Sequence, residues 1–219
     1  MYIPSFNEVN DLAVMHSLIK NHPFAMWTAM ADGELVVNHI PFVLHESKGE
    51  FGTLIGHVAR KNTIWQTCSR EISSAIVFQG VNAYISPSWY ASKHEHGKAV
   101  PTWNYAAVHA WGIPKIIEDR ECLLAHVEEI TDFHEKDQKL PWKVSDAPEE
   151  YINKLLAVIV GIEIPITRLQ GKMKLGQNKS DADKLGMVAG LMSKHTDQTK
   201  YLAQMLNQHI SESKQSNKT

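Results

Sequence analysis

The sequence lacks the features that mark a disulfide-stabilised, zinc-binding or membrane-spanning protein. It contains only two cysteines, Cys68 and Cys122, and they form neither a CxxC pair nor a Cys–His spacing, which predicts reduced thiols. The longest aliphatic run, 155–162, is too short to cross a bilayer, and the amino terminus has no basic segment followed by an apolar one. We therefore expect a soluble, cytoplasmic protein without a membrane partner.

Neither charge sign dominates, and the motifs of the common enzyme classes are missing. The 219 residues include 22 Lys and Arg and 24 Asp and Glu, so a role in coating nucleic acid or anionic membrane would need a local patch. The chain has no GxSxG elbow, Walker loop, GxGxxG or HExxH, which removes support for hydrolase, P-loop and Rossmann chemistry. His94 and His96 form an HxH pair without a third ligand at a recognisable spacing, so we predict no metal site.

Short apolar runs bounded by turn residues predict several β-strands. An Asp32-Gly33 turn separates two of these runs and indicates a hairpin, and Pro41 predicts an edge or a bend in its second arm. This order of strands favours an antiparallel barrel over a doubly wound sheet. The predicted strands cover residues 23–30, 34–45, 51–59, 73–80, 82–86, 102–117 and 158–170.

Helical spacing of apolar residues predicts helices between and after the strands. Asp119 is a plausible cap for a helix that runs to about His134, and Pro148 suits the first turn of a helix that ends near Leu156. Further helices are predicted over 7–20 and 60–68, and two more precede about residue 210. We expect a barrel domain over 1–180, a helical extension over 181–210 packed on it, and a disordered tail over 211–219.

The stretch 78–112 is unusually rich in aromatic and amide side chains. Because tryptophan and tyrosine combine a large flat face with a polar group, they suit the walls of a site for a planar ligand. A Trp-rich barrel core with a surface loop explains the same composition, and composition alone leaves both interpretations open. The aromatic residues of the stretch include Tyr84, Trp89, Tyr90, Trp103, Tyr105 and Trp111.

Two basic segments are candidates for anion binding. In the first, a predicted strand passes into a predicted helix near Arg60 and Lys61, where cations and free backbone N–H groups would suit a phosphate; solvated surface is the alternative. The second can be an exposed linker, an anion site or a patch for a nucleic-acid backbone. Its members are Arg168, Lys172, Lys174, Gln177, Asn178 and Lys179.

Four separated segments, GHVARKN, VFQGVNAYISPSWY, GKAVPTWNYAAVHAWG and LQGKMKLGQNKS, resemble the PaiB-type family of FMN-binding negative transcriptional regulators. The similarity extends from the YIPSF start to the NKSDAD segment. It implies a mainly β protein with flanking helices (α+β), an antiparallel split β-barrel of the FMN-binding type with C-terminal helices. That fold is shared with pyridoxamine phosphate oxidases and flavin reductases. The resemblance also implies a homodimer with FMN at the subunit interface.

The resemblance assigns residues to the two parts of FMN. For the phosphate it implies His57, Arg60, Lys61 and Asn62. For the ring it implies Asn38, His39, Ile40, Pro101, Thr102, Trp103 and Asn104. A last motif, which we expect to reach the partner subunit's flavin, contains Lys172, Lys174, Gln177 and Asn178. Related sequences usually read ARANP, KLSQNRS and QGP where this one has ARKNT, KLGQNKS and QGV, which removes a hydroxyl and a bidentate guanidinium from the last motif.

Three functions follow from this resemblance. The first is a regulator that holds FMN, although the sequence shows neither a basic stripe nor a recognition helix for direct DNA reading. The second is an FMN-dependent oxidoreductase of the same fold, either an NAD(P)H-dependent reductase or an oxidase. The third is a protein that binds another planar molecule such as haem, with His39, His57 and His109 as candidate ligands.

Overall fold

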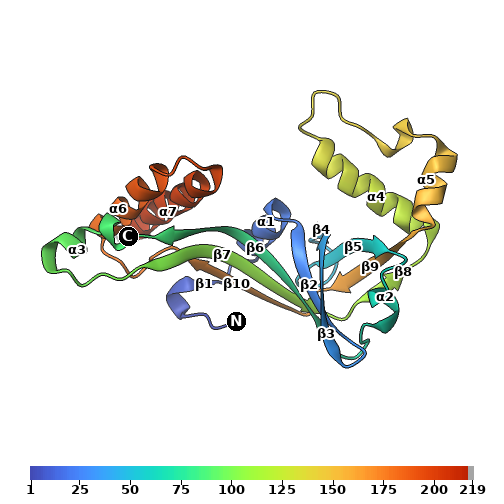
Figure 1. The fold of residues 1–219 in the computed structure, drawn as a ribbon, viewed down its shortest axis with the longest axis horizontal. Helices are drawn as coiled ribbons and strands as arrows, with labels where there is room; N and C mark the ends of the chain where they lie inside the picture. Colours follow the sequence, from blue (N-terminus) through green and yellow to red (C-terminus); the bar gives the residue numbers. More distant parts are fainter. Residues whose placement is uncertain (217–219) are drawn as a thin grey trace. The chain divides into compact units, whose positions relative to one another are not determined.

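The computed structural model describes residues 1–216, with side chains through Ser211, and it contains two compact units. Three strands contribute residues to both units: β6 (Ser74–Ile85), β7 (Thr102–Gly112) and β10 (Arg168–Lys174). Figure 1 shows the elements in chain order. Unit 1 comprises Met1–Asp11, Gln79–Val108 and the chain from Gln170 onward, and unit 2 comprises Leu12–Phe78 and His109–Leu169.

The strands of the described chain form two sheets, with the orders β1-β10-β7-β6-β2-β3 and β4-β5-β9-β8. Within the described chain, six strand pairs have an assigned register, and all six are antiparallel. The prediction of a mainly antiparallel β protein with flanking helices is therefore confirmed.

A two-residue turn and a proline shape the start of unit 2. Asp32 (φ 51°) and Gly33 (φ 84°) join β2 (Phe24–Ala31) to β3 (Glu34–Pro41), and positive φ at both turn positions is the geometry that tight hairpins need. Pro41 ends β3, and after one residue the chain continues as β4 (Val43–His45) in the other sheet. The predicted hairpin and the bend at Pro41 are both confirmed.

Helices in unit 2 pack on the four-stranded sheet, which contains β5 (Thr53–Ala59), β8 (Lys115–Ile117) and β9 (Ile159–Pro165). Asp119 caps α4 (Arg120–Glu135) as predicted, because its carboxylate accepts a hydrogen bond from the N–H of Cys122 at 2.9 Å. Leu123 of α4 packs with Val144, Ile152 and Leu156 of the segment after it, and these four buried residues form one hydrophobic core. The other helical elements of unit 2 are α1 (Leu12–Asn21), α2 (Ile64–Thr67), η3 (Val144–Asp146) and α5 (Glu149–Leu156).

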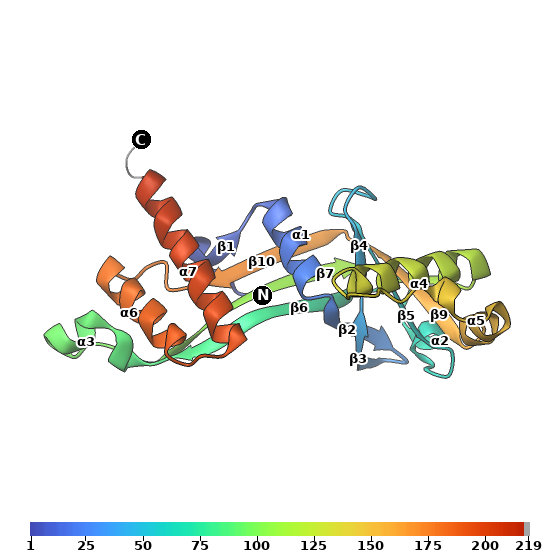
Figure 2. The ribbon, with the colours of Figure 1, turned by 90° about the horizontal axis from the view of Figure 1, so that it is seen from above.

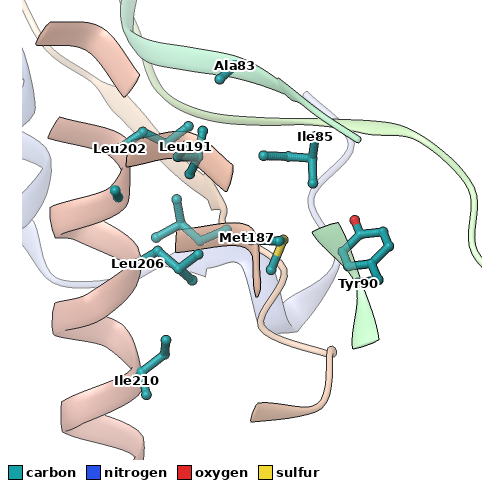
Figure 3. Packing of buried hydrophobic residues seen from close by; sticks show 10 residues of the cluster. Ala83, Ile85, Tyr90, Met187, Leu191, Leu202, Leu206 and Ile210 are labelled. Atoms are coloured by element: carbon teal, nitrogen blue, oxygen red, sulfur yellow. The ribbon is translucent and has the colours of Figure 1, made fainter. Parts of the chain in front are cut away.

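Unit 1 places its helices against one face of its strands. α6 (Asp181–Met192) and α7 (Asp197–Ser216) lie side by side in both views of the fold (Figures 1 and 2). Figure 3 shows Leu202, Leu206 and Ile210 along one face of α7, with Met187 and Tyr90 across from them. The remaining elements are η1 (Ser5–Asn7), β1 (Glu8–Val9), η2 (Pro87–Trp89) and α3 (Ala91–His96).

Two contacts attach the segment before β7 to α6. Asp183 accepts hydrogen bonds from the N–H and the hydroxyl of Ser92, both at 2.9 Å. Trp89 lies against the helix where Gly186 and Gly190 carry no side chain: a Cβ at Gly190 would lie 2.1 Å from Cδ2 of Trp89. The absence of two side chains therefore makes room for one indole ring.

Several predicted boundaries are wrong where pairing between distant strands outweighs local pattern. The helix predicted over 7–20 begins at Leu12, because Glu8 and Val9 pair with β10 as β1. The two strands predicted over 73–80 and 82–86 are the single strand β6, in which Gly80 is buried rather than part of a turn. The strand predicted over 102–117 breaks after Gly112, where a Cβ would lie 2.1 Å from the carbonyl oxygen of Pro165.

The carboxy-terminal half contains longer elements than predicted. β10 continues through Lys174 into the stretch interpreted as a linker, and His94 and His96 lie in α3 instead of a loop. α7 extends to Ser216, so the stretch predicted to be a disordered tail begins as helix, and residues 217–219 lie outside the described chain. Among described residues no helix is both long and apolar enough to cross a membrane, and none of their His, Cys, Asp and Glu side chains form a group of three suited to a metal ion.

The glycine at position 190 gives a test of the Trp89 packing. Replacing glycine by alanine in a helix normally stabilises by about 1 kcal/mol, whereas overfilling a packed contact costs about 1–3 kcal/mol. We expect Gly190→Ala to lower the free energy of unfolding by about 1–2 kcal/mol in urea denaturation. Ala189→Ser, at an exposed position of the same helix, should change it by less than about 0.5 kcal/mol. A Gly190→Ala protein more stable than the parent would contradict this packing.

Candidate functional site

A pair of amide side chains lies at the junction of β3 with the loop before α2. Nδ2 of Asn62 donates to Oδ1 of Asn38 at 2.7 Å, and Oδ1 of Asn62 accepts from the N–H of Ile64 at 3.2 Å. Nδ2 of Asn38 is buried and has no hydrogen-bond partner. Because an unsatisfied buried donor costs free energy, this amide is suited to a ligand acceptor.

Arg60 is committed to its own unit. Its guanidinium donates to Glu118 at 2.7 Å and to the carbonyl oxygens of Ala157 at 3.1 Å and Ile159 at 3.2 Å. It also lies over the ring of Trp65, 5.5 Å from the ring centroid. All three nitrogens of the guanidinium therefore have partners without a ligand.

The helix that follows Arg60 is shorter than the one predicted over 60–68. α2 spans only Ile64–Thr67, which is too short to develop the aligned amides of a helix N-terminus. Lys61, next to Arg60, is exposed. Of the two adjacent cations in this motif, Arg60 is engaged by protein acceptors, whereas Lys61 is exposed.

The other residues that the sequence assigned in unit 2 point in different directions. His57 faces α4, where its Nδ1 lies 3.1 Å from Nε2 of His126, and burial lowers the pKa of His57. His39 is exposed and stacks with Phe24 at 6.1 Å between ring centroids. Ile40 is buried in the core. Unit 2 therefore brings Asn38 and Asn62 together and separates them from the side chain of His57.

A second polar group lies in unit 1 at the start of β7. Nζ of Lys174 donates to Oγ1 of Thr102 and, at 3.0 Å, to the carbonyl oxygen of Trp103. Burial lowers the pKa of Lys174, which favours the neutral amine relative to a lysine in water. The Trp103 ring is 55% exposed and meets Tyr84 edge to face at 6.2 Å between centroids. Unit 1 thus exposes the indole ring of Trp103 next to the amine of Lys174, whose position is fixed by two hydrogen bonds.

Asn104 carries the unsatisfied acceptor of this group. The residue is 1% exposed; its Nδ2 contacts the sulfur of Met187 at 3.8 Å, and its Oδ1 has no partner. Pro101, three positions earlier, is exposed.

The last predicted motif has a structural component. Gln177 folds back on the end of β10, where it accepts from the N–H of Leu175 at 2.9 Å and donates to the carbonyl oxygen of Met173 at 2.5 Å. Nζ of Lys172 donates to the carbonyl oxygen of Tyr2 at 3.0 Å, and its side chain is buried. Asn178 is exposed. Gln177 and Lys172 therefore both stabilise the fold through hydrogen bonds to backbone groups.

Sequence reasoning missed His126. Burial, together with the nearby His57 and His45, lowers the pKa of His126 to about 4. A signal was present, because His126 follows Leu123 at helical spacing and so lies on the buried side of α4. His109, the third histidine of the haem alternative, is partly buried beside Trp111, with ring centroids 5.8 Å apart.

Comparison with known proteins places this chain among flavin-binding proteins. Residues 1–168 match the family described as "Putative FMN-binding domain". An uncharacterised protein of Emericella nidulans is 32% identical, with 95% of this chain and 97% of that protein covered. The protease synthase and sporulation protein PAI 2 of Bacillus subtilis is 27% identical, with 96% of this chain and 98% of that protein covered.

A solved structure supports the fold independently of close sequence similarity. The flavocytochrome Anf3 of Azotobacter vinelandii superimposes with a TM-score of 0.56 at 12% identity, covering 84% of this chain and 78% of that one. This likeness confirms the predicted split-barrel fold. With most of its length matched and the PaiB-type resemblance confirmed, the chain belongs to the family of FMN-binding domains.

Proposed function

We propose that this protein is an FMN-binding regulator that acts as a homodimer. The observation that carries the proposal is the relative from Bacillus subtilis, which is named for protease synthase and sporulation and which aligns over 96% of this chain. An alignment of this extent includes α6 and α7, which lie beyond the 1–168 match to the FMN-binding family. The regulatory proposal therefore concerns the whole chain rather than its FMN-binding part alone.

The residues in each unit fit the chemistry of FMN. A phosphate requires cations and hydrogen-bond donors, and unit 2 offers exposed Lys61. Unit 2 also offers the orphan donor of Asn38, a residue that the resemblance assigns to the ring. A tricyclic ring requires a flat aromatic face, and unit 1 offers the exposed indole of Trp103. When bound, FMN supplies one-electron and two-electron chemistry. The protein supplies a cation, a hydrogen-bond donor and an aromatic face.

The hydrogen bonds of Lys174 give it a positioning role in this proposal. It bridges Thr102 and the backbone of Trp103, so it fixes the start of β7 beside the exposed indole. Its lowered pKa follows from burial, and a bound anion nearby would favour the charged form again. Lys174 therefore combines support of the site with a charge that can respond to FMN.

The homodimer is supported by an exposed apolar face on the β2–β3 hairpin. Phe24, Leu35 and Val37 are 66%, 70% and 48% exposed. The register pairs Leu35 with Met30 and Val37 with Thr28, and alternation along the strands puts all of these side chains on one face. A contiguous apolar sheet face of this kind is typical of a protein interface, and a second copy is the occupant that we propose.

Lys61 gives a direct test of FMN binding. A charged hydrogen bond contributes about 1.5–3 kcal/mol when buried and less at an exposed side chain. We expect Lys61→Ala to weaken FMN binding about fivefold, measured by quenching of flavin fluorescence, and to reduce the salt dependence of the affinity. Lys98→Ala, at another exposed lysine, is the control and should leave both unchanged. Equal affinities for Lys61→Ala and the parent would remove Lys61 from the site.

Arg60→Ala distinguishes ligand binding from structural support. The loss of its contacts to Glu118, Ala157 and Ile159 should lower the free energy of unfolding by about 1–3 kcal/mol in urea. A loss of FMN affinity larger than that of Lys61→Ala, at a temperature where the variant is folded, would return Arg60 to the phosphate contact expected from the sequence.

The proposed dimer predicts an effect of charge on the hairpin face. Leu35→Glu places a carboxylate in the apolar contact, where desolvation without a partner is costly, so we expect light scattering to change from the mass of two chains to that of one. Leu140→Glu is the matched control, because Leu140 is 90% exposed elsewhere in unit 2, and it should remain dimeric. A parent protein of one-chain mass would overturn the dimer.

Regulation and electron transfer predict different activities. We expect deletion of the gene to change transcript levels and the parent gene to restore them, while the purified flavoprotein oxidises NADH or NADPH with acceptor dyes no faster than free FMN. Rapid turnover would instead support the FMN-dependent oxidoreductase. Gel retardation of target promoters that weakens as salt rises would show that the regulation includes direct DNA binding.

A further inference from the structure

Helix α4 crosses the four-stranded sheet of unit 2 with one stripe of side chains. Successive contacts are three residues apart on the helix, and they reach β9, β5 and β4 in the order in which these strands lie in the sheet. The contacts pair Leu123 with Gly161 of β9, His126 with His57 of β5, and Glu129 with His45 of β4. Two of the three contacts therefore involve imidazoles, which can take up a proton.

The central contact is a pair of imidazoles, of which His126 is buried and His57 is partly buried. Nδ1 of His57 lies 3.1 Å from Nε2 of His126, the ring centroids are 5.2 Å apart, and the planes meet at 71°. Because the two nitrogens share one hydrogen, one ring donates and the other accepts when both are neutral. His126 is 5% exposed, and its Nδ1 has no partner. An added proton would leave an imidazolium in a site that provides no further hydrogen bond for it.

The charged groups that face this pair are already engaged with others. The carboxylate of Glu129 on α4 lies 3.0 Å from Nε2 of His45, and Glu163 of β9 forms ion pairs with Lys48 and Lys115. At the start of α4, Arg120 donates to the side chain of Asn153 on α5. Val144, Ile152 and Leu156 from η3 and α5 add only apolar contacts.

We infer that the seating of α4 on this sheet is a pH-sensitive contact, closed while His57 and His126 are both neutral and released when the pair takes up a proton. The other two contacts do not have this property. The apolar contact at Leu123 is independent of pH, and the His45–Glu129 contact gains attraction when His45 is protonated. Acid therefore weakens the central contact, between His126 and His57. Release of α4 then exposes the side of β5 that carries His57.

The direction of the pKa shifts determines whether acid strengthens or weakens the contact. Burial lowers the pKa of both imidazoles, and that of His126 falls to about 4 from the ordinary 6.5. The seated helix thus binds fewer protons than the released one, so the contact has its full strength above about pH 6.5 and loses it as the pH falls toward 4. For His126 alone, linkage gives an increase of about 30-fold in the released-to-seated ratio between pH 7.5 and pH 5.

Hydrogen exchange on the full chain, without added flavin, tests the inference. Exchange protection of amides in α4, corrected for the intrinsic pH dependence of exchange, should fall about 30-fold between pH 7.5 and pH 5. Amides of α6, in the other unit, should keep their protection. Equal protection of α4 at the two pH values would overturn the inference.

Two variants separate the imidazole pair from general acid sensitivity. His126→Phe retains a ring without a titrating group and should abolish the pH response of α4, whereas His134→Gln, at an exposed histidine of the same helix, should keep it. If His126→Phe does not fold, His57→Phe tests the same contact from the strand, and NMR titration of the parent should find the His126 imidazole with a pKa well below 6.5. A full pH response in either phenylalanine variant, or a His126 pKa at 6.5, would also overturn the inference.

Discussion

The pairing of β5 with β9 is the interaction on which unit 2 depends. The register runs from Thr53 opposite Pro165 to Ala59 opposite Ile159, and it places Gly161 directly across from His57. Because Gly161 has no side chain, α4 can approach the sheet closely enough for His126 to reach His57. At the end of the same ladder Arg60 turns back on Ala157 and Ile159, which leaves Lys61 and Asn62 at the mouth of the following loop. One ladder of backbone hydrogen bonds therefore sets both the seat of a helix and the position of the proposed phosphate residues.

In unit 1, the strands hold an exposed aromatic face in place. Its strands bury one side under α6 and α7, and the other side presents Trp103 and Tyr84. Lys174 fixes the start of β7 through Thr102 and the Trp103 carbonyl, so the open indole is attached to a rigid edge. An exposed ring on a well-ordered strand can meet a planar ligand at little cost in conformational entropy.

The sequence predicted the local features well and the long-range ones poorly. The Asp32-Gly33 hairpin, the Asp119 cap and the bend at Pro41 follow from turn and cap chemistry that acts over a few residues, and all three are found. The pairing of Glu8 with Lys172 and the buried position of Gly80 depend on strands far apart in the chain, and neither could be predicted. The candidate site shows the same division. The sequence identified the motif around Arg60, but only the fold shows that Glu118 and two carbonyl oxygens already occupy its guanidinium.

The glycine opposite His57 has a consequence for other chains of this fold. A Cβ at position 161 would lie 2.9 Å from Cβ of Ile117 and 3.1 Å from Cδ2 of Leu123, so a larger residue there requires β8 or the side chain of Leu123 to shift. Chains of this fold that carry a larger residue at this position should therefore show β8 or α4 displaced from the strand.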